Sequence, residues 1–154
     1  MFSFEKYHIL NEASATPFLK FYHHLEKGVD PDIDTIDECL RILEFYYDDY
    51  IKWYDKYPEK MREPVQKRIY KDYEKQLHRI REALSPRTNI NMKIFAVDQG
   101  ISQWHYDFPV IAHMEMEEED DREEQKWTEV GDILVRLGKI SQTSPYNPKG
   151  SMDY

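Results

Sequence analysis

The stretch DPDIDTIDECLRILEFYYDDYIKWYDKYP, residues 30–58, decides the fold. It opens with aspartates suited to a helix N-cap and a negatively charged first turn, and Pro58 stops it, so the pattern predicts one helix over residues 34–57. The apolar residues form two adjacent stripes at helical spacing: Ile36, Leu40, Leu43, Tyr47, Tyr50, Ile51 and Tyr54, and Cys39, Ile42, Tyr46, Trp53 and Tyr57. Together they cover about half of the helix surface, which is more than one neighbour can bury. We therefore expect a central helix that contacts at least two others.

Two further helices are expected on either side of this segment. Thr16 as N-cap, Pro17 at the first helical position and Gly28 as C-cap predict a short helix over residues 17–27. A third helix is predicted over residues 64–84, because its apolar residues recur at spacings of three and four, namely Val65, Ile69, Tyr73, Leu77, Ile80 and Leu84. The first half of the chain is therefore predicted to consist of three helices.

After Pro86 the apolar period changes. Apolar and aromatic residues alternate with other residues in three runs: Ile90, Met92 and Ile94; Trp104, Tyr106 and Phe108; and Val110, Ala112, Met114 and Met116. Asp98-Gln99-Gly100 is typical of a turn. We therefore predict a β-hairpin or small meander over residues 90–116, with a kinked helix as the alternative, because short apolar runs do not fix the period.

The remaining segments complete a prediction of an α+β fold that is mostly α. Thr128 can cap a last helix over residues 128–137, which Gly138 terminates. Residues 141–154 have little apolar surface to bury, so we expect a polar tail that is extended or disordered. One globular domain is expected over residues 1–140.

The charge of the chain is concentrated in two segments. Its 154 residues carry a net charge of −9. Residues 115–124, the acidic segment, hold eight acids and one base, so they carry −7 and the rest of the chain only −2. Residues 62–82 hold seven bases and four acids, which makes the predicted third helix mildly basic.

A cytoplasmic location without a membrane partner is expected. Cys39 is the single cysteine, so no intramolecular disulfide can form, and no N-x-Ser/Thr sequon is present. No apolar run approaches the roughly 18 residues of a membrane span. The first residues also lack the charged and apolar regions of a secretory signal, so we do not expect export by that route.

The common catalytic signatures are missing from the sequence. The five glycines form neither a G-x-G-x-x-G turn nor a phosphate-binding loop, and no G-x-S-x-G or H-E-x-x-H motif occurs. Cys39 falls on the apolar flank of a predicted helix, where a thiol acts as a small inert hydrophobe. We therefore predict no catalytic residue, no cofactor and no metal.

A helical metal-binding protein or metalloenzyme is the main alternative. Its candidate ligands are His23, His105 and His113 with nearby carboxylates, and His105-x-Asp107 has the residue types of a two-histidine, one-carboxylate iron site. No histidine follows His113, however, and the chain lacks the paired Glu-x-x-His motifs of a di-iron bundle. An exposed polar face is the favoured interpretation of these residues.

A nucleic-acid-binding accessory protein is a further alternative. Lys67, Lys71 and Lys75 repeat every four residues on one side of the predicted third helix. Nucleic-acid-binding domains usually have a pI above about 9. The pI of this chain is about 5.1, so we favour a protein partner over a nucleic acid.

The acidic segment indicates a non-enzymatic, acidic protein-binding module that acts as an adaptor, regulator or inhibitor. Such a segment can steer a partner with a basic surface toward an apolar contact. Aromatic residues are enriched at interfaces, and Phe45 falls on the polar side of its helix. The expected partner-binding residues are Glu117, Glu118, Glu119, Asp120, Asp121, Glu123, Glu124, Trp127 and Phe45. Two other interpretations stay open: the segment docks on the basic third helix of its own molecule, or it is a solvated loop.

Overall fold

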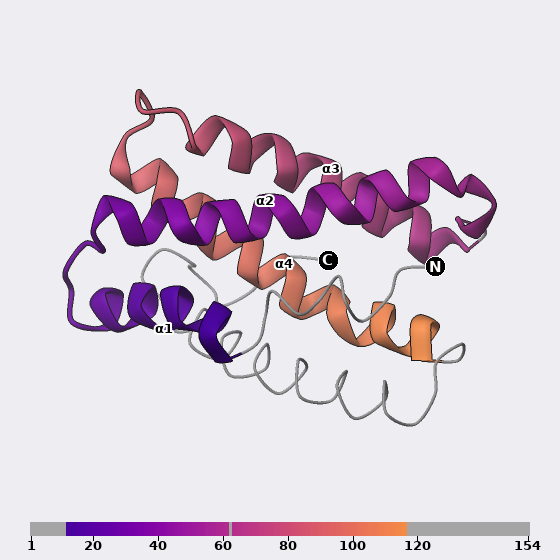
Figure 1. Cartoon of the computed structure of the whole chain (residues 1–154), viewed down its shortest axis with the longest axis horizontal. Helices are drawn as coiled ribbons and strands as arrows, with labels where there is room; N and C mark the ends of the chain where they lie inside the picture. The colour runs from indigo at the N-terminus through magenta and orange to yellow at the C-terminus, as the bar shows by residue number, and fades with distance from the viewer. Residues whose placement is uncertain (1–11, 62, 117–154) are drawn as a thin grey trace.

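Four α-helices make up the part of the chain that the structure describes. They are α1 (Glu12–Glu26), α2 (Ile33–Lys56), α3 (Pro64–Ala83) and α4 (Ile90–Met116), and a short 3-10 helix, η2 (Pro58–Lys60), leads from α2 to α3 (Figure 1). The structure is a computed structural model, which describes residues 12–61 and 63–116. The side chains of residues 12–15, 60 and 108–116 are outside this description.

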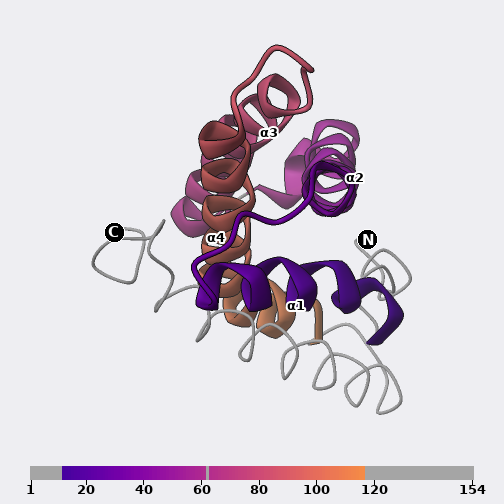
Figure 2. The same cartoon turned by 90° about the vertical axis from the view of Figure 1, so that its left-hand side faces the viewer.

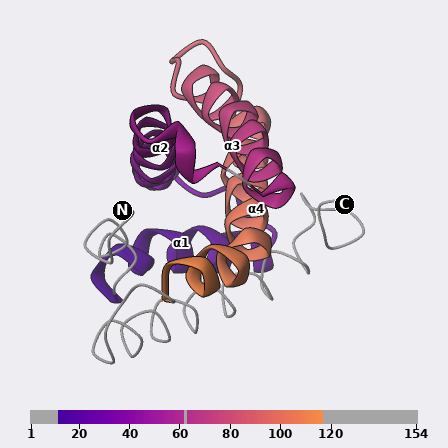
Figure 3. The same ribbon diagram turned by 90° about the vertical axis from the view of Figure 1, so that its right-hand side faces the viewer.

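Helix α2 occupies the centre of the fold. It contacts each of α1, α3 and α4, which confirms the prediction of a central helix with at least two neighbours. Two views from opposite sides, each turned by 90° from Figure 1, show α1 and α3 on different sides of α2 (Figures 2 and 3). The wide apolar arc of α2 is covered because a different helix packs on each part of it.

The predicted β-hairpin over residues 90–116 is wrong, and with it the α+β fold class. The segment is the single helix α4, and the described residues form an all-α fold without a strand. Four fully buried residues of α4 follow each other at spacings of three and four, namely Ile94, Val97, Ile101 and Trp104. The apparent alternation does not mark one face, because Met92 and Tyr106 are about half exposed while Ile94 and Trp104 are buried.

Gly100, which the sequence placed in a turn, lies in the middle of α4, where the side chain of Leu43 on α2 packs against it. A Cβ atom on Gly100 would lie 2.8 Å from Cδ1 of Leu43, a distance that real Cβ contacts do not reach. The hydroxyl of Tyr47 also donates a hydrogen bond to the carbonyl oxygen of Gly100, with an O···O distance of 2.5 Å. Glycine is therefore present here for a helix crossing and not for a turn.

The first helix begins earlier than predicted but ends within one residue of the predicted end. Helix α1 begins at Glu12, so Pro17 lies inside it and Thr16 is not its N-cap. A proline so near the start of a helix removes one backbone hydrogen bond, that from residue 17 to residue 13, and the helix continues. At the other end Gly28 has a φ of 72°, as the predicted C-cap requires. Hydrogen bonds from the amide of Gly28 to Leu25 and from that of Val29 to His24 complete a Schellman motif.

Side-chain caps define the starts of α2 and α3. Asp32 accepts hydrogen bonds from the backbone amide of Thr35 at 3.0 Å and from its hydroxyl at 2.8 Å, and these bonds lower the pKa of the Asp32 carboxyl. Glu63 and Gln66 form a reciprocal capping box at the start of α3. The predicted helices 34–57 and 64–84 match α2 and α3 to within one residue, so both are confirmed.

Three predictions about the second half of the chain are not tested by the fold. The last helix over residues 128–137 and the polar tail over residues 141–154 lie outside the described residues. The predicted single domain over residues 1–140 extends past them as well.

Aromatic side chains form the core where α2, α3 and α4 meet. Tyr46 stacks on Trp104 with ring centroids 4.0 Å apart, and Tyr73 lies edge-on to Tyr47 and Tyr50 at 4.4 and 4.7 Å. All five side chains are almost completely buried. Aromatic pairs in such geometries add about 0.5–1.5 kcal/mol each beyond the burial of their area. Most of the aromatic residues of α2 therefore belong to the core.

Substitutions at Leu43 and Gly100 test this packing. Leu43→Ala should lower the free energy of unfolding by about 2–5 kcal/mol, through lost transfer energy and a cavity. Lys52→Ala, on the exposed side of α2, should change it by less than about 0.5 kcal/mol. In a Gly100→Ala background, Leu43→Ala should cost about 1 kcal/mol less, because the added methyl group already presses on Leu43.

Urea denaturation of these variants gives the measurement. Equal and small effects at positions 43 and 52 would contradict the central position of α2. An unchanged cost of Leu43→Ala in the Gly100→Ala background would contradict the close approach of α2 and α4.

Candidate interaction surface

A polar network joins α3 to α4 inside the fold. Asp107 has an exposed fraction of 0%, and its carboxylate accepts hydrogen bonds from Nη2 of Arg68 at 2.8 Å and from Nε2 of Gln103 at 2.6 Å. The network continues from Gln103 to Gln76 and from Gln76 to Arg79. Burial raises the pKa of the Asp107 carboxyl, and the bonds from Arg68 and Gln103 oppose this shift. Asp107, the carboxylate of the iron-site alternative that the sequence analysis considered, thus serves in helix packing.

Two other buried charged side chains also bridge helices. Lys93, with an exposed fraction of 4%, donates from Nζ to the carbonyl oxygen of Ala83 on α3 at 2.5 Å and to Asp37 on α2 at 3.3 Å. Asp98 on α4 accepts a hydrogen bond from the hydroxyl of Tyr22 on α1 at 2.7 Å. Buried polar groups therefore hold α4 against each of the other three helices.

Most of the residues predicted to bind a partner lie outside the described residues. Phe45 is described: it lies on α2 with an exposed fraction of 51%, as its place on the polar side of the helix predicted. The others, for which nothing is described, are Glu117, Glu118, Glu119, Asp120, Asp121, Glu123, Glu124 and Trp127.

The candidate metal ligands are not brought together among the described residues. His23 is exposed on α1, while His105 is partly buried on α4, where burial lowers the pKa of its imidazole. His113 belongs to α4, but its side chain is outside the description. No group of three or more His, Cys, Asp or Glu side chains that could hold a metal ion occurs in the described part of the chain.

The thiol of Cys39 lies in the core. Its side chain has an exposed fraction of 0%, and burial raises the pKa of the thiol well above its ordinary value. A protonated thiol without solvent access is a poor nucleophile. The placement agrees with the sequence interpretation of Cys39 as a core residue.

The outer side of α3 carries a row of three exposed lysines, the lysine face: Lys67, Lys71 and Lys75. Each of them lies two residues before a core residue of α3, namely Ile69, Tyr73 and Leu77. Two residues correspond to about 200° around a helix, so the row points away from the core. None of the three forms an ion pair with another described residue, whereas Arg68 and Arg81 on the same helix each bind two carboxylates. Like charges four residues apart destabilise a helix by about 0.2–0.5 kcal/mol per pair, so this row is unfavourable in the isolated helix.

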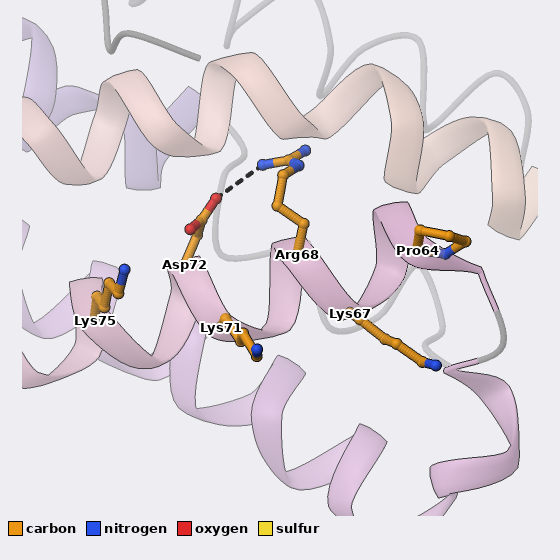
Figure 4. Close-up of a pocket in the computed structure, with 6 residues that line it drawn as sticks. All are labelled: Pro64, Lys67, Arg68, Lys71, Asp72 and Lys75. Atoms are coloured by element: carbon orange, nitrogen blue, oxygen red, sulfur yellow. Dashed lines mark hydrogen bonds and ion pairs between the residues drawn. The ribbon is translucent and has the colours of Figure 1, made fainter.

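The lysine face borders an open hollow on the surface of α3. The hollow has a volume of about 390 Å³ and is lined by Pro64, Lys67, Arg68, Lys71, Asp72 and Lys75. Figure 4 shows Arg68 and Asp72 paired beneath α4, with Lys67 and Lys71 pointing away from that helix. Four cationic side chains line this hollow against one acid, Asp72, which already pairs with Arg68, so the hollow carries a net positive charge.

Two aromatic residues of α4 each lie under an arginine of α3, and one of these arginines, Arg68, also lines the hollow. The guanidinium of Arg68 lies 5.8 Å from the ring centre of Tyr106, and that of Arg79 lies 5.1 Å from the ring centre of Phe95. Both rings remain partly exposed. We call these four residues the Arg–aromatic border. Arginine and aromatic residues are the types that protein interfaces favour.

Sequence reasoning missed the Arg–aromatic border because it treated residues 90–116 as strands. The signal that could have found it is helical spacing: Met92, Phe95, Gln99 and Tyr106 follow each other at intervals of three, four and seven. Such intervals place all four on one side of a helix. The basic row on α3, by contrast, was visible in the sequence.

Comparisons with known proteins give no relative. No family model matches the chain, and no curated protein or solved structure matches it either. In the described part of the chain, no helix combines the length and the apolar character that crossing a membrane requires.

Removing Arg68 tests the role of the buried Asp107 pair. Arg68→Met should lower the free energy of unfolding at pH 7 by about 2–3 kcal/mol, less than for a fully buried pair because Arg68 is 35% exposed. The pKa of Asp107, already raised, should rise further without its cation, so the folded variant binds a proton that the unfolded chain has lost. The deficit should therefore shrink as the pH falls toward about 4, the ordinary pKa of an aspartate.

Urea denaturation of wild type, Arg68→Met and Arg68→Lys at both pH values provides the measurement. Arg68→Lys keeps a positive charge, so its free energy of unfolding should fall less than that of Arg68→Met. A deficit that is the same at pH 7 and at about pH 4 would show that Asp107 does not depend on Arg68 for its charge.

Proposed function

We propose that this chain is a non-enzymatic protein-binding module that acts as an adaptor, regulator or inhibitor of a protein partner. The observation that carries the proposal is the division of polar groups in the described helices. The buried ones, such as Asp107, Lys93 and Asp98, bridge helices. The lysine face and the Arg–aromatic border lie on the outside, where they can contact a partner.

The acidic segment is proposed to steer a partner with a basic surface. It begins in the last turn of α4 and continues to residue 124, and it carries −7 of the net charge of −9. Charge concentrated in this way speeds the encounter with an oppositely charged surface, mainly at low salt. Trp127 and the exposed Phe45 are the proposed apolar contacts.

We also propose a cytoplasmic location. The single cysteine is enclosed in the core and forms no disulfide, which suits a reducing compartment.

Neutralising the acidic segment tests the proposal. Glu117, Glu118 and Glu119 are changed to Gln, and Asp120 and Asp121 to Asn. Association with a partner captured from the source cells should become several-fold slower at low salt, while the melting temperature stays nearly unchanged. The matched control neutralises five exposed acids of the helical body instead, namely Glu26, Asp34, Glu38, Glu59 and Glu74.

Three outcomes would contradict the proposal. An unchanged association rate together with an unchanged melting temperature would show that the segment is only a solvated loop. A salt-dependent loss of stability would place its role inside its own molecule. Finally, about one iron, manganese or zinc per chain in protein purified without a histidine tag would favour the metalloprotein alternative.

A further inference from the structure

We propose that the lysine face of one copy of this chain binds the acidic segment of a second copy, so that two copies exchange segments in a dimer. The inference rests on the proposed function, because it names the partner with a basic surface that the acidic segment engages. It starts from one observation: three exposed cations in a row on α3 form no ion pair with another described residue.

The charges of the two surfaces are complementary. The acidic segment carries −7, and the rest of the chain carries only −2, so a body that receives the segment is nearly neutral overall. On that body the lysine face presents three uncompensated positive charges. At about 0.1 M salt the screening length is about 10 Å, so contacts across the face remain attractive while the repulsion between whole molecules is largely screened.

The acidic segment, when extended, matches the lysine face in residue spacing and exceeds it in length. Lysines four residues apart on a helix are about 6 Å apart, so the face is about 12 Å long. Alternate residues of an extended chain are about 6.6–6.8 Å apart, so an extended run of acids can bring one carboxylate to each lysine. The eight residues 117–124 span up to about 26–29 Å when extended, which is more than the face requires.

The orientation of the lysine face favours a second molecule over the same one. Helix α4, which leads into the acidic segment, packs on another side of α3, through the bonds of Arg68 to Asp107 and Gln76 to Gln103. Lys67 and Lys71 point away from α4 (Figure 4), and each of the three lysines lies about 200° around α3 from the core residue two positions further on. The three lysines are exposed, so a second copy can approach this face directly.

A protein segment also fits this surface better than a nucleic acid does. The chain has a net charge of −9, which repels phosphates, and its basic row contains only three lysines on one side of one helix. Single-stranded nucleic acids are held by bases stacked on open aromatic rings, but Phe95 and Tyr106 each have an arginine over the ring. Because each copy offers one face and one segment, two copies satisfy both contacts in a closed dimer.

Analytical ultracentrifugation of the full chain over a range of concentrations tests the proposal. At about 0.1 M salt a concentration-dependent dimer is expected, and at about 1 M salt, where screening reduces the range to about 3 Å, a monomer. Changing Lys67, Lys71 and Lys75 to Gln should weaken dimerisation at least about tenfold. The matched control changes Lys27, Lys52 and Lys56 to Gln, three exposed lysines elsewhere, and should dimerise like wild type.

A charge exchange gives the sharper test. One variant carries Lys67→Glu, Lys71→Glu and Lys75→Glu. The other carries Glu117→Lys, Glu118→Lys, Glu119→Lys, Asp120→Lys and Asp121→Lys, which changes the net charge of residues 115–124 from −7 to +3. Each alone should be monomeric, because its face and its segment have the same sign. Their mixture should form a dimer, because each face then meets a segment of opposite charge. Far-UV circular dichroism confirms that the variants are folded.

Several results would each overturn the inference. They are a wild-type monomer at every concentration, an equal loss in the control variant, a mixture that stays monomeric, and salt-sensitive retention of a monomer on DNA or RNA through the three lysines. Carbodiimide cross-links between the segment and the lysines within a single monomer would also reject the second copy. If the chain is monomeric but a different captured protein still requires residues 117–121, the proposed function stands and this inference alone fails.

Discussion

The wide apolar arc of α2 is the constraint on which the rest of the structure depends. Ten residues of this helix are buried, and no single neighbour can cover a surface that extends so far around it. Helices α1, α3 and α4 each cover a part. At Gly100 the absence of a side chain lets Leu43 of α2 reach the backbone of α4. The stack of Tyr46 on Trp104 then fills the space where α2 and α4 meet α3.

Buried polar contacts fix how the helices are arranged around this core. Apolar packing alone tolerates sliding between helices, but a buried carboxylate or ammonium group must meet a particular partner. Asp107 meets Arg68 of α3, Lys93 meets the end of α3 and Asp37 of α2, and Asp98 meets Tyr22 of α1. Arg68 of α3 is held between helices by these contacts, whereas the lysine face lies on the outer side of α3. The same arrangement places Tyr106 against Arg68 and Phe95 against Arg79, so the Arg–aromatic border follows from the packing of α4 on α3.

Local signals in the sequence were sufficient for α2 and α3 but not for α4. Prolines, caps and regular apolar spacing give the bounds of α2 and α3 to within one residue. In α4 the apolar stripe of Ile94, Val97 and Ile101 is interrupted by buried polar residues, whose partners come from distant parts of the chain. Gly100 resembles a turn residue for the same reason, because the helix that requires it is some fifty residues away in the sequence. The lysine face follows from spacing alone, whereas the Arg–aromatic border needs α4 to be a helix.

The reactivity of the Cys39 thiol tests the central position of α2 most directly, since the chain has no other cysteine. The thiol lies in the core, on the buried side of α2, and Cys39 has an exposed fraction of 0%. If three helices enclose α2, a thiol reagent should label Cys39 only when the core opens, and the free energy of that opening should equal the global free energy of unfolding from urea denaturation. Labelling of the folded protein at the rate of a free thiol, or through an opening far smaller than global unfolding, would contradict the account.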